Sequence, residues 1–101
     1  MQTLRIVIMK SEILKQFGKH VRYLRQLQDL SQEALAEKVN MYRTYIGMIE
    51  RGERNPALLN LIRLASALDI SLPELLRAML MTGTVIMNLT DSYGFLGLRN
   101  I

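Results

Sequence analysis

The chain has 101 residues, a formal net charge of +4 and a sequence pI near 9.8, which favours a single small domain with a polyanionic partner. Because it contains no cysteine, a disulfide framework, a thiolate metal site and a cysteine nucleophile are excluded, and a reducing cytoplasm is compatible with the sequence. No apolar run approaches the ~18 residues of a membrane span, so we expect no membrane partner.

The first amphipathic segment runs from about Ser11 to Gln28 and predicts a helix. Its apolar residues recur at steps of three and four and form one stripe: Ile13, Phe17, Val21, Leu24 and Leu27. The preceding run, Leu4 to Met9, is short and rich in β-branched residues, so it favours a strand. It could pair with a similar run, Thr84 to Leu89, within the chain or across a dimer, or it could be an unstructured lead.

A second, shorter helix is expected from Ser31 to about Val39. The Ser31 hydroxyl can cap its first turn, and Leu30 can pack on Leu35 as a hydrophobic staple. Asn40 should form the turn after it, because asparagine tolerates the left-handed conformation well.

A third helix is expected from about Tyr42 to Arg51, with Met41 entering the core before it and Gly52 ending it. Ile46 and Ile49 should point inward. Two short helices around a tight turn are a common arrangement for presenting side chains to the DNA major groove.

The fourth helix follows the turn at Asn55 and Pro56. The residues expected to face inward are Leu58, Leu61, Leu64, Ala65 and Leu68. A capping box of Ser71 and Glu74 starts a fifth helix, which should end near residues 81–83. The sequence therefore predicts an all-α, five-helix domain over residues 11–82, an N-terminal extension over 1–10 and a C-terminal tail over 83–101 that is loose from about Asp91.

Four strings carry a resemblance that covers about two thirds of the chain, from Phe17 to Leu80. They are Val21 to Arg25 (VRYLR), Leu30 to Ala36 (LSQEALA), Ile49 to Gly52 (IERG) and Leu64 to Leu68 (LASAL). With these strings the chain resembles the phage-repressor/Cro-like helix-turn-helix family of transcriptional regulators. Two further strings, Arg43 to Ile46 and Glu50 to Asn55, are similar to the controller proteins of restriction-modification systems. The resemblance implies a repressor-like fold.

Four residues of the third helix are candidates for reading DNA bases: Arg43, Thr44, Gly47 and Met48. The Arg43 guanidinium can form a bidentate contact with guanine O6 and N7, and Thr44 offers a hydroxyl and a methyl group. A glycine inside a short helix, as at Gly47, is unfavourable for helix formation. Either a close approach to DNA or a packing contact with a neighbouring helix would explain its presence. Met48 stands where the family often carries a polar residue, so it could touch a thymine methyl or only pack.

Candidates for holding DNA phosphates flank the third helix on both sides. They are Ser31, Gln32, Tyr42, Tyr45, Arg51, Arg54 and Asn55. Gln32 resembles the family's glutamine that bonds a phosphate while bracing the next helix. By the same resemblance, Glu50 is a structural residue that pairs with Arg25 of the first helix.

Enzyme activity is not expected, because His20 is the only histidine and no glycine-rich phosphate loop, serine elbow or paired-carboxylate motif is present. We expect no cofactor and no metal site. The sequence instead predicts a cytoplasmic regulator that binds double-stranded DNA sequence-specifically as a homodimer on a palindromic operator. Its expected dimer interface is apolar: Leu72, Leu76, Met79 and Leu80. An antitoxin-like regulator that also binds a toxin, or a helix-turn-helix interaction module without DNA binding, remain as alternatives.

Overall fold

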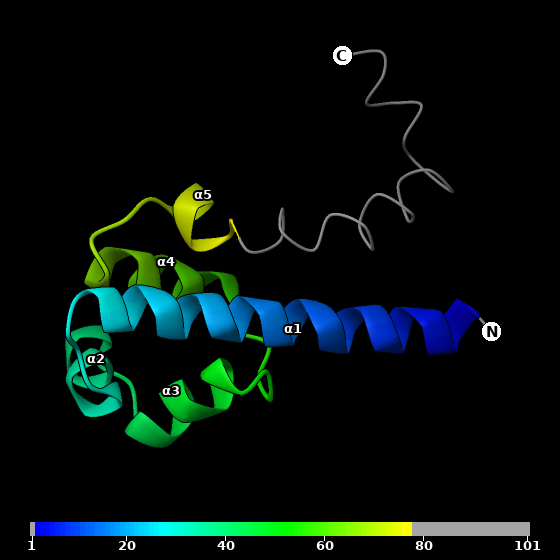
Figure 1. Ribbon diagram of the computed structural model, residues 1–101, viewed down its shortest axis with the longest axis horizontal. Helices are drawn as coiled ribbons and strands as arrows, with labels where there is room; N and C mark the ends of the chain where they lie inside the picture. The colour runs from blue at the N-terminus through cyan, green and yellow to red at the C-terminus, as the bar shows by residue number, and fades with distance from the viewer. Residues whose placement is uncertain (1, 78–101) are drawn as a thin grey trace, which may run out of the picture.

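The computed structural model describes the backbone of residues 2–77 and the side chains of residues 10–77. Five helices lie in this range: α1 (Gln2–Leu27), α2 (Gln32–Val39), α3 (Arg43–Glu50), α4 (Leu58–Ala67) and α5 (Leu72–Leu75). In the view of Figure 1, α2 and α3 lie on one side of α1, with α4 and α5 on the other. Among residues 2–77 no strand is present, so the predicted all-α, five-helix fold is confirmed.

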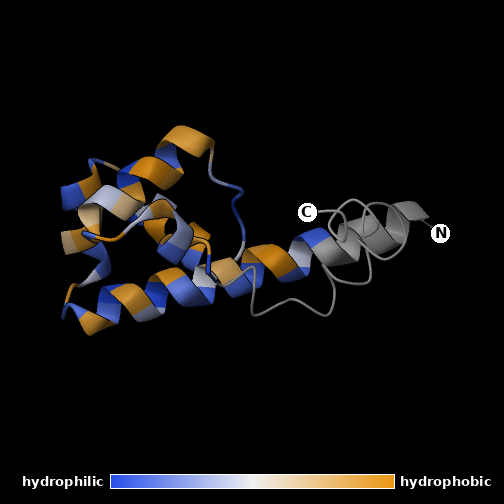
Figure 2. Ribbon diagram, turned by 90° about the horizontal axis from the view of Figure 1, so that it is seen from above, coloured by the Kyte–Doolittle hydropathy of each residue, from blue (hydrophilic) through white to orange (hydrophobic). Residues whose placement is uncertain are grey.

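All five helices contribute to one hydrophobic core. Apolar and polar residues alternate along the described part of α1 (Figure 2), as expected for a helix with one buried face. The largest fully buried side chains are Leu35, Ile46, Ile49, Leu64, Leu68, Leu75 and Val21. Each such side chain contributes about 1.5–3 kcal/mol to folding by leaving water. The core therefore holds the α2–turn–α3 unit in place against α1 and α4.

The polar residues at the helix ends behave as the sequence predicts. The Ser31 hydroxyl accepts a hydrogen bond of 3.0 Å from the backbone N–H of Ala34, which caps α2. Ser71 caps α5 in the same way, through the N–H of Glu74 at 3.2 Å. Asn40 has a left-handed backbone with a φ of 60°, and Gly52, with a φ of 77°, follows the end of α3. Ser31 and Asn40 therefore set the two ends of α2, and Gly52 stops α3.

The expected strand at Leu4 to Met9 is wrong, because α1 begins at Gln2 and is helical through these residues. An isolated strand leaves its backbone donors and acceptors without partners, whereas extending an existing helix adds one hydrogen bond for each residue fixed. Helix extension therefore outweighs the weak strand preference of β-branched residues. The predicted strand at Thr84 to Leu89, the predicted end of the fifth helix and the loose tail lie outside the described residues.

Two leucines that the periodicity places in the core are exposed instead. Leu27 has 62% of its surface exposed and Leu58 has 64%. Each lies at the end of a helix, Leu27 as the last residue of α1 and Leu58 as the first of α4. The periodicity predicts on which face of the helix a side chain lies. It does not predict whether the neighbouring elements extend far enough to cover that face at the end of the helix.

No helix of the described part of the chain is long and apolar enough to cross a membrane.

Candidate nucleic-acid interface

The C-terminal end of α3 is anchored by a buried ion pair between Arg25 of α1 and Glu50 of α3. Arg25 Nε donates to Glu50 Oε2 at 2.7 Å, and Arg25 Nη2 donates to Glu50 Oε1 at 3.0 Å. Only 8% of the surface of each residue is exposed. The two parallel bonds make this a bidentate pair, the geometry that gives a guanidinium–carboxylate contact both strength and direction.

Two further hydrogen bonds extend the pair into the turn before α2 and into α2 itself. Arg25 Nη1 donates to the Leu30 carbonyl at 2.8 Å, and Gln32 Nε2 donates to Glu50 Oε1 at 3.1 Å. Within the described residues, no buried side-chain nitrogen or oxygen lacks a hydrogen-bond partner. The charges are therefore compensated inside the protein, and the network fixes α2 and α3 to α1 as one unit. Gln32 thus braces α3 through its amide nitrogen.

The four candidate base-reading residues lie on α3, but they differ in accessibility. Arg43 and Thr44 are exposed, Met48 is half-buried and Gly47 is buried. A β-carbon at Gly47 would lie 3.1 Å from Arg51 Nη1 and 3.8 Å from Gln32 Oε1. The side chains of these two residues therefore cover Gly47, which supports the packing explanation for a glycine at this position. The exposed N-terminal end of α3 presents Arg43 and Thr44 to solvent.

Arg43 forms an ion pair with Glu33 of α2. The distance between Arg43 Nε and Glu33 Oε1 is 3.3 Å, and the two side chains are 62% and 75% exposed. The pair bridges the two helices of the helix-turn-helix on their outer surface. An exposed pair of this kind contributes at most about 1 kcal/mol to stability, so its main effect is on the position of the guanidinium.

The candidate phosphate-binding residues come from the start of α2 and from both ends of α3. Tyr42 is almost fully exposed, and Ser31, Arg51, Arg54 and Asn55 are exposed as well, whereas Gln32 and Tyr45 are half-buried. The Tyr45 hydroxyl accepts a hydrogen bond of 3.3 Å from Asn60 Nδ2 of α4. Its own proton is not used in that bond and can be donated to another acceptor.

Arg51 is held by Glu53. Arg51 Nε donates to Glu53 Oε2 at 2.7 Å, and Nη2 donates to Oε1 at 3.3 Å. This hydrogen bonding, together with the attraction between the charges, raises the pKa of Arg51. The hydrogen bond from Arg51 also lowers the pKa of Glu53. Both groups therefore stay charged at neutral pH.

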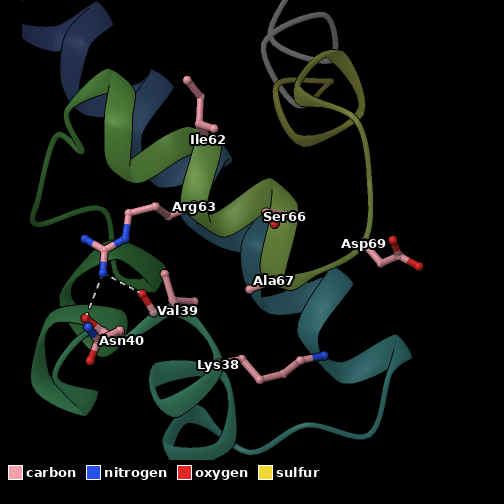
Figure 3. Close-up of a pocket in the computed structure, with 8 residues that line it drawn as sticks. All are labelled: Lys38, Val39, Asn40, Ile62, Arg63, Ser66, Ala67 and Asp69. Carbon is pink, nitrogen blue, oxygen red and sulfur yellow. Dashed lines mark hydrogen bonds between the residues drawn. The ribbon is translucent and has the colours of Figure 1, made fainter.

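A pocket is lined by residues of α2 and α4 and of the turns that follow them (Figure 3). Arg63 crosses it, and its Nη2 donates to the carbonyls of Val39 at 2.7 Å and Asn40 at 3.0 Å. A cation at the C-terminal end of α2 satisfies carbonyls that the helix leaves unpaired and interacts favourably with the helix dipole. The hydrogen bonds of Arg63 therefore join α4 to the C-terminal end of α2.

In the part of the chain that the structure describes, no group of three or more potential ligand side chains could hold a metal ion.

Sequence reasoning missed four polar residues that position the site: Glu33 as the partner of Arg43, Glu53, Asn60 and Arg63. Glu33, Asn60 and Arg63 each contact a residue of another helix, and no local pattern marks such a contact. For Glu53 the spacing of two residues from Arg51 is a possible signal, since both side chains follow the same helix end.

Residues 21–75 match the helix-turn-helix family, and the chain therefore belongs to that family. Among its relatives, the control protein C.SmaI of Serratia marcescens is 49% identical over 65 residues, which cover 64% of this chain and 77% of the relative. The crystal structure of the restriction-modification controller protein C.AhdI from Aeromonas hydrophila matches with a TM-score of 0.61 and 48% identity, over 61% of this chain and 94% of that chain. The C.Esp1396I controller protein tetramer, solved in complex with its natural 35-base-pair operator, matches with a TM-score of 0.59 and 30% identity, over 67% of this chain and 95% of that chain. The predicted resemblance to controller proteins is confirmed.

Proposed function

We propose that this protein is a sequence-specific transcriptional regulator of the controller type, which binds double-stranded DNA as a homodimer on a palindromic operator. The observation that carries the proposal is the pairing of an exposed reading surface with a rigid support. Arg43 and Thr44 are exposed at the start of α3, while Glu50 at its end is locked to Arg25. A helix held in this way can enter the major groove without losing its orientation.

On the proposed complex, Arg43 contacts a guanine and Thr44 a neighbouring base edge, with Met48 beside them. Phosphates on one side of the groove are bound by Ser31, Gln32 and the free amides at the start of α2. On the other side, Arg51, Arg54 and Asn55 bind the second backbone, and Tyr42 and Tyr45 donate their hydroxyls. The exposure of most of these side chains supports the assignment.

The proposed homodimer has two candidate surfaces. Leu72 and Leu76, expected from the sequence to lie in the interface together with Met79 and Leu80, are half-buried against the protein's own core. The large apolar side chains left exposed on α4 are Leu58, Leu59 and Ile62. Because exposed apolar residues that gather on one helix are typical of interfaces, we propose that the α4 surface contributes to the dimer.

Three relatives among curated proteins are control proteins, which supports a regulator rather than a toxin-binding antitoxin or an interaction module without DNA binding. The same relatives support a binding protein rather than an enzyme, and the proposal includes no catalytic activity and no cofactor. We propose the cytoplasm as the site of action, in keeping with duplex DNA as the proposed ligand.

Selection of bound sequences from a random duplex library tests the proposal. We expect a two-fold symmetric motif, because two identical protomers read two half-sites. Binding to the selected duplex should weaken with salt, with log K falling against log salt at a slope of roughly −5 if about six charges are neutralised per dimer. Failure to enrich any motif, together with a slope near zero, would reject DNA binding, and a non-symmetric motif would reject the homodimer.

A further inference from the structure

Glu33 lies on the proposed DNA-facing surface although its charge opposes DNA binding. It belongs to the first turn of α2, its side chain is 75% exposed, and its carboxylate is 3.3 Å from Arg43 Nε. The N-terminal end of a helix favours an acidic residue. Glu37, one turn further along α2, is also exposed and forms no ion pair among residues 10–77. Besides its place in the first turn of α2, Glu33 differs from Glu37 by its contact with Arg43.

The geometry of the contact leaves the reading end of Arg43 free. A guanidinium has five N–H groups arranged in a rigid plane, and Glu33 occupies the Nε edge. The contact of 3.3 Å between Arg43 Nε and Glu33 Oε1 is the shortest between the two side chains, and the Arg43 side chain is 62% exposed. The two terminal nitrogens, Nη1 and Nη2, form the fork that matches guanine O6 and N7. The same guanidinium can therefore keep Glu33 at one edge and hold guanine at its end.

We propose that Glu33 is a positioning residue that raises the sequence selectivity of DNA binding by orienting Arg43 and by withholding it from phosphates. The inference rests on the proposed DNA-binding function and adds the source of its selectivity. On an operator, Arg43 keeps Glu33 and contacts guanine. On unrelated DNA, a guanine is not fixed at the position that Arg43 reads, and a phosphate contact would compete with the neighbouring carboxylate for the same cation.

The test is the ratio of affinities for the selected duplex and for a random duplex in Glu33→Gln, with Glu37→Gln as the matched control. Both substitutions remove one negative charge from the same helix at exposed positions. In Glu33→Gln the ratio should fall about tenfold, within the discrimination that one bidentate base contact provides, mainly because random DNA is bound more tightly. In Glu37→Gln both affinities should change together, and the ratio should stay within twofold, as for a purely long-range charge effect.

A double-mutant cycle shows whether Glu33 acts through Arg43. In an Arg43→Ala background, Glu33→Gln should leave the remaining selectivity unchanged, because the side chain that it positions is gone. The salt dependence gives a second measure: on random DNA, Glu33→Gln alone should steepen the slope by about one unit per protomer, as the released arginine reaches a phosphate. If Glu33 were only structural, its effect on selectivity would not depend on Arg43, and the salt slope on random DNA would not steepen.

Equal effects of Glu33→Gln and Glu37→Gln on the affinity ratio would overturn the inference, and so would a loss of selectivity that persists in the Arg43→Ala background. In both of these cases the wild-type protein still prefers its selected duplex, so the proposed function stands. A wild-type protein that shows no preference among duplexes would overturn the proposed function and the inference together.

Discussion

The carbonyl oxygen of Glu50 lies 2.5 Å from the position that a β-carbon would occupy at Gly18. The carbonyl of Ile49 is also in contact with that position. The C-terminal end of α3 therefore packs directly on the backbone of α1, and any larger residue at Gly18 would push α3 outward. This close approach also brings Glu50 to Arg25, which lies further along α1.

Gly18→Ala should destabilise the protein although alanine favours helices by about 1 kcal/mol over glycine. The β-carbon would overlap backbone atoms, which cannot move without displacing α3, so we expect a net loss of about 1–3 kcal/mol. Urea unfolding followed by circular dichroism measures it. Gly47→Ala is the control, because there the nearest atom is the flexible end of Arg51. Equal stability changes in the two variants would contradict this packing.

Glu50→Ala should behave as a folding defect rather than as the loss of a DNA contact. Removal of the carboxylate leaves Arg25 buried without a countercharge, at a cost of about 3–5 kcal/mol. That is a large fraction of the 5–15 kcal/mol by which small proteins are typically stable. The thermal midpoint should fall accordingly.

The double variant Arg25→Met with Glu50→Leu should recover most of that stability, because it leaves no buried charge unpaired. If the double variant is no more stable than Glu50→Ala, the loss does not arise from an uncompensated charge at Arg25.

Features that depend on neighbouring residues in the chain could be predicted from the sequence. Ser31 and Ser71 cap helices because their hydroxyls reach N–H groups three residues later, and Asn40 and Gly52 end helices because they tolerate a positive φ. The pairing of Arg25 with Glu50 came from the resemblance to a known family, since no local rule connects residues on two different helices.

Features that depend on how helices meet could not be predicted. Gly18 has no local signal, because its role follows from the approach of α3 to α1. The exposure of Leu58 depends on where the neighbouring elements end, and the contact of Glu33 with Arg43 depends on the angle between α2 and α3. The strand expected at Leu4 to Met9 failed because residue preference was considered without the helix that follows.

The pKa of Glu53 should lie below that of an ordinary glutamate, because Arg51 donates hydrogen bonds to its carboxylate. A lowered pKa in the folded state means that the pair adds stability above the pKa of the unfolded chain, and that this stability is lost as pH falls through the folded pKa. Carboxyl titration by NMR measures the pKa directly. In Arg51→Ala it should return to the ordinary value, and an unchanged pKa in that variant would show that Arg51 does not perturb Glu53.

Charging the exposed apolar surface of α4 should give a folded monomer that binds operator weakly. In Leu58→Lys with Ile62→Lys, the new charges lie on a surface that is already exposed, so the core is not disturbed. Burying two lysines in an interface would be strongly unfavourable. Sedimentation gives the oligomeric state and circular dichroism the folding control. A variant that remains dimeric would assign the interface to Leu72, Leu76 and the residues that follow them.

Arg43 and Arg54 carry the same charge, but we assign the first to a base edge and the second to the DNA backbone. Arg43→Ala should cost about 1–3 kcal/mol on the operator and much less on unrelated DNA, and it should relax selection at one base pair in each half-site. Arg54→Ala should weaken binding to both duplexes by similar amounts and reduce the salt slope by about one unit per protomer.

Both arginines are exposed, so each variant should keep the wild-type melting temperature, which is the control for the comparison. Arg43→Lys separates charge from geometry: lysine keeps the positive charge but lacks the planar fork, so it should lose operator selectivity almost as alanine does while it retains affinity for random DNA. If Arg43→Ala instead weakens binding to operator and random DNA equally, α3 does not read bases through this residue, and the assignment of Arg43 is wrong.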